Sequence, residues 1–373
     1  MRRVKQRAAK GRGRKLLVPI AVGLVVLTAA AAAFAATKWP TQAQEISTAG
    51  INKNIKFCGS KPITLSVIDG FGVNAWSQES YAAVKSTAAQ CKNVKVITAA
   101  SDGVASTMIS QINSAVAQGA NAMTIIPDAG AALPALDAAT KAGVKVVTWG
   151  SNPGGTDGSD YLDYVDWNDG YAGTLWANWM VKALHGHGNV IYTGGPAGNA
   201  VGADQLTAIV KVFANHPGMK LLTGDSTWPV TNWDPATAAT VTASLLSQYP
   251  KIDGIISNYG TDALASAQAF QKAGRKLVPI ATLDANGLSC LYKSKKVPLE
   301  TISSRNWLGR IAARKAIAAA EGLTNGEPSI INLPPFEDTL AGKTYQCNPK
   351  AAPDFYPSNK LTTAQIKQYG SSS

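Results

Sequence analysis

The sequence predicts an α/β protein in which two successive halves each form a parallel sheet covered by helices. Short, apolar, β-branched runs of strand length alternate with helical patterns of 12–15 residues throughout the middle of the chain. The alternation starts again after a strand-like run at 161–167, so each half holds about 100–120 residues, which is the size of one domain. Strands separated by helices in this way run parallel and are joined by crossover connections.

The first half begins with the run Ile63–Ile68, which is apolar and bounded by turn residues. The pattern becomes helical at Trp76, because Tyr81, Val84 and Ala88 follow at helical spacing. Three more strands are predicted at 94–98, 122–126 and 144–148, with helices at 104–118 and 131–142.

The second half repeats the pattern with helices at 169–184, 200–215, 235–248 and 262–273 and strands at 189–192, 220–223, 254–257 and 278–283. Proline at position 235 suits the first turn of a helix. A short helix at 286–293, a strand at 299–303 and a helix at 307–321 follow. The segments 37–55 and 328–357 are predicted to be irregular.

The net charge of +12 does not indicate a nucleic-acid partner, because eight of the basic residues lie in the first fifteen positions. The remaining chain carries a charge of only +4. An apolar segment of 21 residues, Leu16–Ala36, follows the basic residues, and Ala33-Phe34-Ala35 fits a cleavage site. Residues 1–36 are therefore predicted to be a signal peptide or a retained membrane anchor, and the rest of the chain to be extracytoplasmic.

Four cysteines in an exported chain predict two disulfide bonds, for which three pairings exist. We favour Cys58–Cys91, because each cysteine precedes a predicted strand and those two strands should be parallel neighbours. Cys290–Cys347 would then fasten the C-terminal segment. No spacing resembles a zinc site, and neither a metal nor a cofactor is predicted.

An ordered set of segments spread over about residues 60–325 resembles the sugar-binding, ribose-type periplasmic binding proteins of bacterial ABC importers. The segments that carry this resemblance are Ser101-Asp102-Gly103, Gln111-Ile112, Ala117-Gln118-Gly119-Ala120-Asn121-Ala122, Ile126-Pro127-Asp128, Ala131-Ala132-Leu133, Ala142-Gly143-Val144, Ala273-Gly274 and Leu283-Asp284.

The resemblance implies a type I periplasmic-binding-protein fold with two lobes and three crossings between them, near 163–166, 283–285 and 302–304. We expect an N-terminal lobe of residues 51–163 plus 285–302 and a C-terminal lobe of residues 164–284 plus 303–345. Residues 346–373 would form a tail. Closure about the hinges would bury a ligand between the lobes.

Mapping the contacts of that family onto this chain places the ligand beside strand ends and hinge segments. The residues reached in this way are Asn74, Trp76, Trp149, Trp167, Asn168, Gln205, Trp233, Asn258, Tyr259, Asp284 and Ser304. Five of the nine tryptophans in the chain follow strand ends, where they could serve as stacking surfaces for a sugar ring. Asp284 is predicted to accept hydrogen bonds from two ligand hydroxyls. Gln205 and Ser304 stand where the family has an arginine and a glutamine, and Trp149-Gly150 where it has an aspartate, so ribose itself is not implied.

The resemblance predicts a monomeric binding protein that captures a small sugar or a similar solute and delivers it to an ABC permease. The aromatic residues would also suit a cationic or more apolar ligand. A sensory module for a membrane partner is an alternative, which a retained anchor would favour. A glycosidase would need two carboxylates at one bond, and no motif supports such a pair.

Overall fold

The computed structural model describes residues 38–72, 74–127 and 131–371. The predicted signal peptide or anchor, residues 1–36, lies outside this part of the chain. Within the described part, none of the helices combines the length and the apolar character needed to cross a membrane. From Trp39 onward the chain forms one unit that contains two six-stranded sheets.

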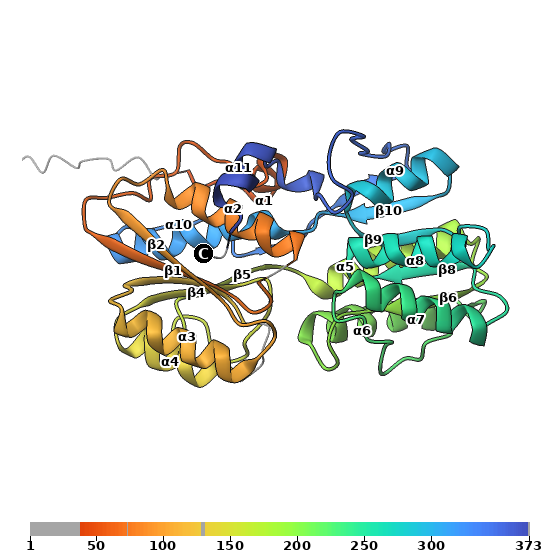
Figure 1. The fold of residues 1–373 in the computed structure, drawn as a ribbon, viewed down its shortest axis with the longest axis horizontal. Coiled ribbons are helices and arrows are strands. Elements are labelled where there is room, and N and C mark those ends of the chain that lie inside the picture. The colour runs from red at the N-terminus through yellow and green to blue at the C-terminus, as the bar shows by residue number, and fades with distance from the viewer. Residues whose placement is uncertain (1–37, 73, 128–130, 372–373) are drawn as a thin grey trace, which may run out of the picture. The chain divides into compact units, whose positions relative to one another are not determined.

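The first sheet has the strand order β11-β5-β4-β3-β1-β2, and every neighbouring pair is parallel. Its strands are β1 (Ile63–Asp69), β2 (Val94–Ala100), β3 (Ala122–Ile126), β4 (Lys145–Trp149), β5 (Asp163–Trp167) and β11 (Ile330–Ile331). Helices α2 (Ala75–Ala88) and α10 (Gly309–Glu321) cover one face, and α3 (Ala105–Ala117) and α4 (Leu133–Lys141) cover the other (Figure 1).

The second sheet has the order β12-β10-β9-β8-β6-β7 and is parallel except for β12. Its strands are β6 (Gly188–Thr193), β7 (Met219–Leu221), β8 (Gly254–Ser257), β9 (Ile280–Leu283), β10 (Leu299–Ile302) and β12 (Pro335–Asp338). Its helices are α5 (Asp169–Ala183), α6 (Ala200–Ala214), α7 (Pro235–Gln248), α8 (Gly260–Lys272) and α9 (Asn286–Lys295). These two sheets with their helices confirm the predicted fold class.

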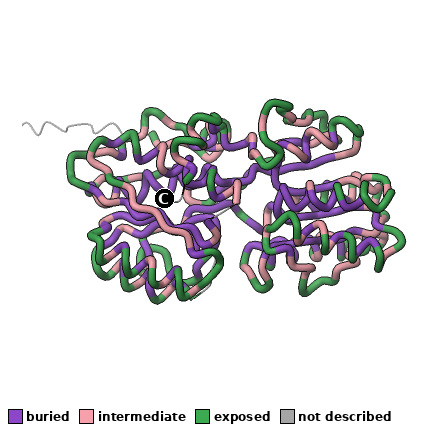
Figure 2. The backbone as a smooth tube through the Cα atoms, in the orientation of Figure 1, coloured by how far each residue is buried: buried purple, intermediate pink, exposed green. Residues whose placement is uncertain are grey.

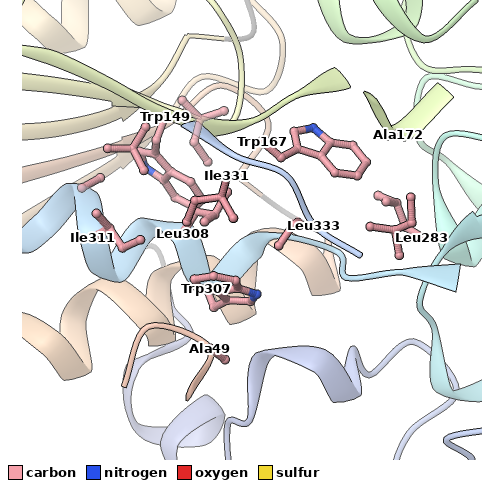
Figure 3. Packing of buried hydrophobic residues seen from close by; sticks show 14 of the residues in the cluster. Ala49, Trp149, Trp167, Ala172, Leu283, Trp307, Leu308, Ile311, Ile331 and Leu333 are labelled. Atoms are coloured by element: carbon pink, nitrogen blue, oxygen red, sulfur yellow. The ribbon is translucent and has the colours of Figure 1, made fainter. Parts of the chain in front are cut away.

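Buried residues lie along the strands of both sheets and on the helices that cover them (Figure 2). One cluster lies between the first sheet and α3 and α4, and another between the second sheet and α7 to α9. The largest cluster is shared, because it runs from α2 and α10 through the crossing segments to α5 and α6. Figure 3 shows this continuity, with Trp149 beside Leu308 and Ile311, and Trp167 directed toward Leu283.

The structure corrects the predicted boundaries between the lobes. Strand β10 pairs with β9, so residues 285–302 belong to the second lobe and the chain does not cross near 283–285. Helix α10 packs on β3 and β4, so it belongs to the first lobe. The three crossings follow β5, β10 and β11. The error arose because sequence patterns identify a strand but do not say which neighbour it pairs with.

Two short helices were not predicted. Helix α1 (Gln42–Thr48) lies in the lead-in that was expected to be irregular, and α11 (Thr363–Tyr369) lies in the tail. Each has seven residues, which is too short for an apolar period to appear. Each also begins with a capping box, Thr41 with Gln44 and Thr362 with Gln365. That spacing of threonine and glutamine was the available signal.

Both predicted disulfide bonds are confirmed. Cys58–Cys91 joins the segment before β1 to the turn before β2, and these strands are parallel neighbours as expected. Cys290–Cys347 joins α9 to residues 345–361, which we call the C-terminal strap. The strap continues into α11, and α11 packs against α2 of the first lobe. The strap therefore connects the two lobes outside the three crossings.

Candidate functional site

A pocket lies where loops from both lobes meet, beyond the carboxyl ends of the strands. Its empty volume is about 420 Å³, including the part that is open to solvent. The described residues that line it are Phe71, Asn74, Trp76, Ile126, Gly150, Trp233, Asn258, Tyr259, Leu283 and Arg305. Ligands of open α/β sheets bind at this end of the strands. We call this cavity the solute pocket.

Four of the ten described residues that line the solute pocket are aromatic. Trp76, in the first turn of α2, stacks on Trp149 with ring centres 5.8 Å apart and an angle of 26° between the planes. Its indole nitrogen donates a 2.7 Å hydrogen bond to the carbonyl of Ser304, which fixes the ring. Phe71 of the first lobe and Trp233 of the second lobe pack in a T-shaped arrangement, with ring centres 4.9 Å apart. This pair is a direct contact between the lobes across the pocket.

Arg305 is the one charged residue among the described residues that line the pocket. Its Nη1 donates to the carbonyl of Gly150 at 2.6 Å and to Asp166 Oδ1 at 2.9 Å. The guanidinium lies 5.2 Å from the ring centre of Trp167 and 6.0 Å from that of Trp76, which is within the range of cation–π attraction. Its Nε is buried and has no hydrogen-bond partner among the described residues. The described residues therefore leave this donor without an acceptor.

Arg305 also adopts a left-handed backbone conformation, with φ of 62°. Such a conformation is uncommon for a residue with a side chain and often marks a functional position. Arg305 lies after β10, where the chain crosses between the lobes, so the backbone of the hinge fixes the position of its side chain.

Two asparagines present donors to the same pocket. The Oδ1 of Asn258 accepts a 3.1 Å hydrogen bond from the indole of Trp233, and its Nδ2 is buried without a partner among the described residues. The Oδ1 of Asn74 caps α2 by accepting from the backbone of Ser77 at 2.9 Å. Each amide oxygen is therefore occupied by the protein, while each amide nitrogen can donate to a ligand oxygen.

The structure brings five of the predicted site residues together in the pocket lining, namely Asn74, Trp76, Trp233, Asn258 and Tyr259. Trp149 lies behind Trp76 and is only 2% exposed, and Trp167 is buried beneath Arg305. Both tryptophans support lining residues without lining the pocket.

The other four predicted residues do not line it. Asn168 caps α5 by accepting from the backbone of Tyr171. Gln205 is buried and bonds to Tyr192 and Asp169 at 3.2 and 3.1 Å. Ser304 contributes the carbonyl that holds Trp76.

Asp284 is fully buried, and the protein itself occupies both carboxylate oxygens. Oδ1 accepts from the backbone of Ser304 at 2.5 Å and from the hydroxyl of Ser358 at 2.9 Å, and Oδ2 accepts from the backbone of Ser358 at 2.9 Å. Ser358 belongs to the C-terminal strap, which the sequence did not place here. Asp284 thus fastens the strap to the crossing after β10. Burial raises the pKa of Asp284 to about 6 despite these hydrogen bonds.

This pKa predicts a measurable pH dependence of stability. The folded value of about 6 lies above the ordinary value of 3.8, so the folded state binds the proton more tightly than the unfolded state does. The resulting stability is complete below the unfolded pKa and is lost as the pH rises through 6. Since one pKa unit corresponds to about 1.4 kcal/mol, Asp284 should contribute about 3 kcal/mol to this loss.

Urea unfolding of the parent and of Asp284→Asn between pH 4 and pH 8 measures this contribution. Other buried carboxyls titrate in both proteins, so the difference between the two curves isolates Asp284. Identical pH slopes in the two proteins would contradict the assignment.

Sequence reasoning missed Phe71, Ile126, Leu283 and Arg305 as lining residues, whereas Gly150, mapped together with Trp149, does line the pocket. Phe71 stands in the same loop as Asn74, and Arg305 directly follows Ser304, so the predicted positions were adjacent to the observed ones. The signal for Arg305 was a cation immediately after a predicted strand at a crossing between lobes.

Comparisons with known proteins agree with this architecture. The model of the periplasmic binding protein domain family matches residues 67–324. A xylitol-binding protein of Mycolicibacterium smegmatis is 26% identical over 245 residues, which cover 65% of this chain and 67% of that protein.

Solved structures share the fold at lower identity. The periplasmic component of an arabinose ABC transporter from Shewanella has a TM-score of 0.64 and 21% identity, covering 73% of this chain and 91% of that chain. The myo-inositol binding protein of Caulobacter has a TM-score of 0.67 and 19% identity, covering 77% and 97%. Because the family model spans well over half of the sequence, this chain belongs to the periplasmic binding protein domain family.

Proposed function

We propose that the protein captures a small hydroxylated solute, a sugar or a polyol, between its two lobes and delivers it to an ABC import permease. The observation that carries this proposal is the solute pocket, which both lobes line and across which Phe71 and Trp233 touch. Contacts of this kind form when lobes close on a ligand and part when they open.

The chemistry of the lining favours a ring or chain that has an apolar face and many oxygens. Trp76, Trp233 and Tyr259 offer flat apolar surfaces for stacking. The amide nitrogens of Asn74 and Asn258 and the Nε of Arg305 are donors, which hydroxyl oxygens can accept. A cationic solute fits less well, because the guanidinium of Arg305 stands in the wall. The relatives support the same class, since they bind xylitol, arabinose and myo-inositol.

We assign ligand contact to the five predicted lining residues and to Arg305. Trp149, Trp167, Asn168, Gln205, Asp284 and Ser304 then act as supports of the pocket and the hinge. We further propose that the protein works as a monomer outside the cytoplasm, held at the membrane or released according to the fate of residues 1–36. The family and the two disulfide bonds support this location.

A thermal-shift screen against pentoses, hexoses, pentitols and inositols tests the function. A ligand present at about 100 times its Kd should stabilise the parent by about 2.7 kcal/mol. Trp76→Ala and Trp233→Ala should each remove that shift, because each deletes a stacking face. Trp39→Ala, which lies outside the pocket, is the matched control and should respond as the parent does. The assignment fails if both pocket variants keep the full shift.

A further inference from the structure

A second pocket lies in the first lobe, at the end of α2 remote from Trp76. Its empty volume is about 560 Å³, including the part that is open to solvent. The described residues that line it are Gly50, Ile51, Asn52, Lys53, Ser86, Thr87, Gln90, Arg310, Arg314 and Gln365. They come from the loop after α1, from α2 and the turn that follows it, from α10 and from α11. We call this cavity the basic pocket, because three lining residues are cationic and none is a carboxylate.

Arg310 lines the basic pocket and is only 3% exposed. Its Nη1 donates to the carbonyls of Ala49 and Asn359 at 2.5 and 2.8 Å. Among the described residues, Arg310 has no carboxylate within ion-pairing distance. Carbonyl dipoles satisfy one guanidinium nitrogen but leave the positive charge uncompensated. A buried charge without a counter-charge is costly, so the site favours an added anion.

The acids nearby do not supply the missing negative charge. Glu327 is committed to Arg314, with contacts of 2.5 Å to Nη2 and 2.9 and 3.0 Å to Nε. Glu45 also faces Arg314, with 3.8 Å between its Oε2 and Nη2 of Arg314. Burial, followed by the hydrogen bond with Glu327, raises the pKa of Glu45 to about 8. Both nearby carboxyls therefore face Arg314, and Arg310 has no acid partner among the described residues. Burial, followed by the proximity of Arg314, lowers the pKa of Arg310 to about 10.

The rim of the pocket adds donors of the kind that recognise oxyanions. Lys53 supplies an exposed ammonium, and Gln90 and Gln365 supply primary amides. The Oε1 of Gln365 accepts from the backbone of Thr362, which leaves its amide nitrogen as the group that can donate. Arginine with lysine and amide donors, in a cavity lined by no described carboxylate, matches the chemistry of phosphate and sulfate binding.

We propose that the basic pocket binds a small oxyanion of the phosphate or sulfate class. The anion would contact Arg310 and Lys53 and would link the loop after α1 to α2 and α11. The site is separate from the solute pocket, since the two linings share no residue. The same chemistry would accept free inorganic phosphate or a phosphodiester headgroup on a membrane surface.

Calorimetric titration of the full chain with inorganic phosphate, in sodium chloride of matched ionic strength, tests the proposal. We expect saturable binding by the parent and none by Arg310→Met. Lys53→Met changes an exposed side chain, so it should fold normally, and it should weaken binding about two- to fivefold. Trp233→Ala lies in the other pocket and should bind phosphate as the parent does.

The absence of saturable heat in the parent would overturn the proposal. So would equal affinity in the parent and in Lys53→Met, which remains informative even if Arg310→Met fails to fold. Phosphate also acts on the whole protein surface as a stabilising salt. That general effect does not saturate and would be the same in the parent and in both variants, so it can be told apart from binding at the pocket. Co-sedimentation with vesicles of phosphatidylglycerol, compared with vesicles of phosphatidylcholine, identifies the source of the bound phosphate group. Binding to phosphatidylglycerol that depends on Lys53 indicates a lipid headgroup. If the protein binds inorganic phosphate but not these vesicles, the ligand is a free anion.

Discussion

Replacing Arg305 with methionine should abolish solute binding and lower the free energy of unfolding by about 3–5 kcal/mol. Binding is lost because the variant removes the charged donor of the solute pocket and the cation between Trp76 and Trp167. Stability is lost because Asp166 is fully buried and pairs with Arg305 at 2.9 Å. Methionine fills much of the space but leaves that carboxylate without its counter-charge.

The double variant Arg305→Met, Asp166→Asn separates these two effects. Asparagine removes the unpaired charge, so most of the stability should return, while solute binding should stay lost. Arg305→Lys keeps the positive charge but has a single ammonium group. That group cannot donate to Gly150 and Asp166 and also replace the arginine Nε that would face a ligand, so the variant should bind the solute weakly. Urea unfolding and the thermal-shift screen measure the two quantities. Normal solute binding by Arg305→Met would remove Arg305 from the site.

Sequence patterns located the solute pocket because parallel strands place their carboxyl ends at one edge. Asn74, Trp76, Trp233, Asn258 and Tyr259 all follow strands directly or lie in the loops beyond them, so their convergence follows from the topology. A position in a loop, however, does not fix the direction of a side chain.

Asp284 shows what local patterns leave undetermined. It ends a strand beside the hinge, as predicted, but Ser358 takes the hydrogen bonds that a ligand hydroxyl was expected to donate. Ser358 lies 74 residues further along the chain, in a proline-rich segment with no periodic pattern. The same limit explains why β10 and α10 were each predicted in the wrong lobe. Pairing between distant segments depends on packing that the sequence pattern does not reveal.

Replacing Glu79 with alanine should detach the C-terminal strap from the first lobe and destabilise the protein by about 3–5 kcal/mol. Glu79 is buried in α2. It accepts hydrogen bonds from the backbone of Tyr356, the amide of Asn306 and the amide of Asn359. Alanine leaves these three donors without their acceptor, and each unsatisfied buried donor costs about 1–3 kcal/mol.

Glu79→Gln is the matched control, because it keeps one of the two acceptor oxygens and nearly the same volume. Burial raises the pKa of Glu79 well above its ordinary value, so a neutral side chain is compatible with this site. Glutamine should therefore retain more of the stability than alanine does, because its one amide oxygen still accepts while its amide nitrogen leaves a donor without an acceptor. Gln78→Ala, an exposed neighbour on the same helix, should change little.

The loss should extend beyond local stability, because the strap is anchored in both lobes. Its other end is held to α9 by the Cys290–Cys347 bond and by Asn286, whose amide donates to the carbonyls of Asn348, Ala351 and Ala352 at 2.9–3.1 Å. Freed from Glu79, the strap would no longer limit how far the lobes separate. Small-angle scattering of the solute-free protein should then give a larger radius of gyration for Glu79→Ala than for Glu79→Gln. Equal radii and equal hydrogen exchange at 354–361 in the two variants would show that Glu79 does not hold the strap.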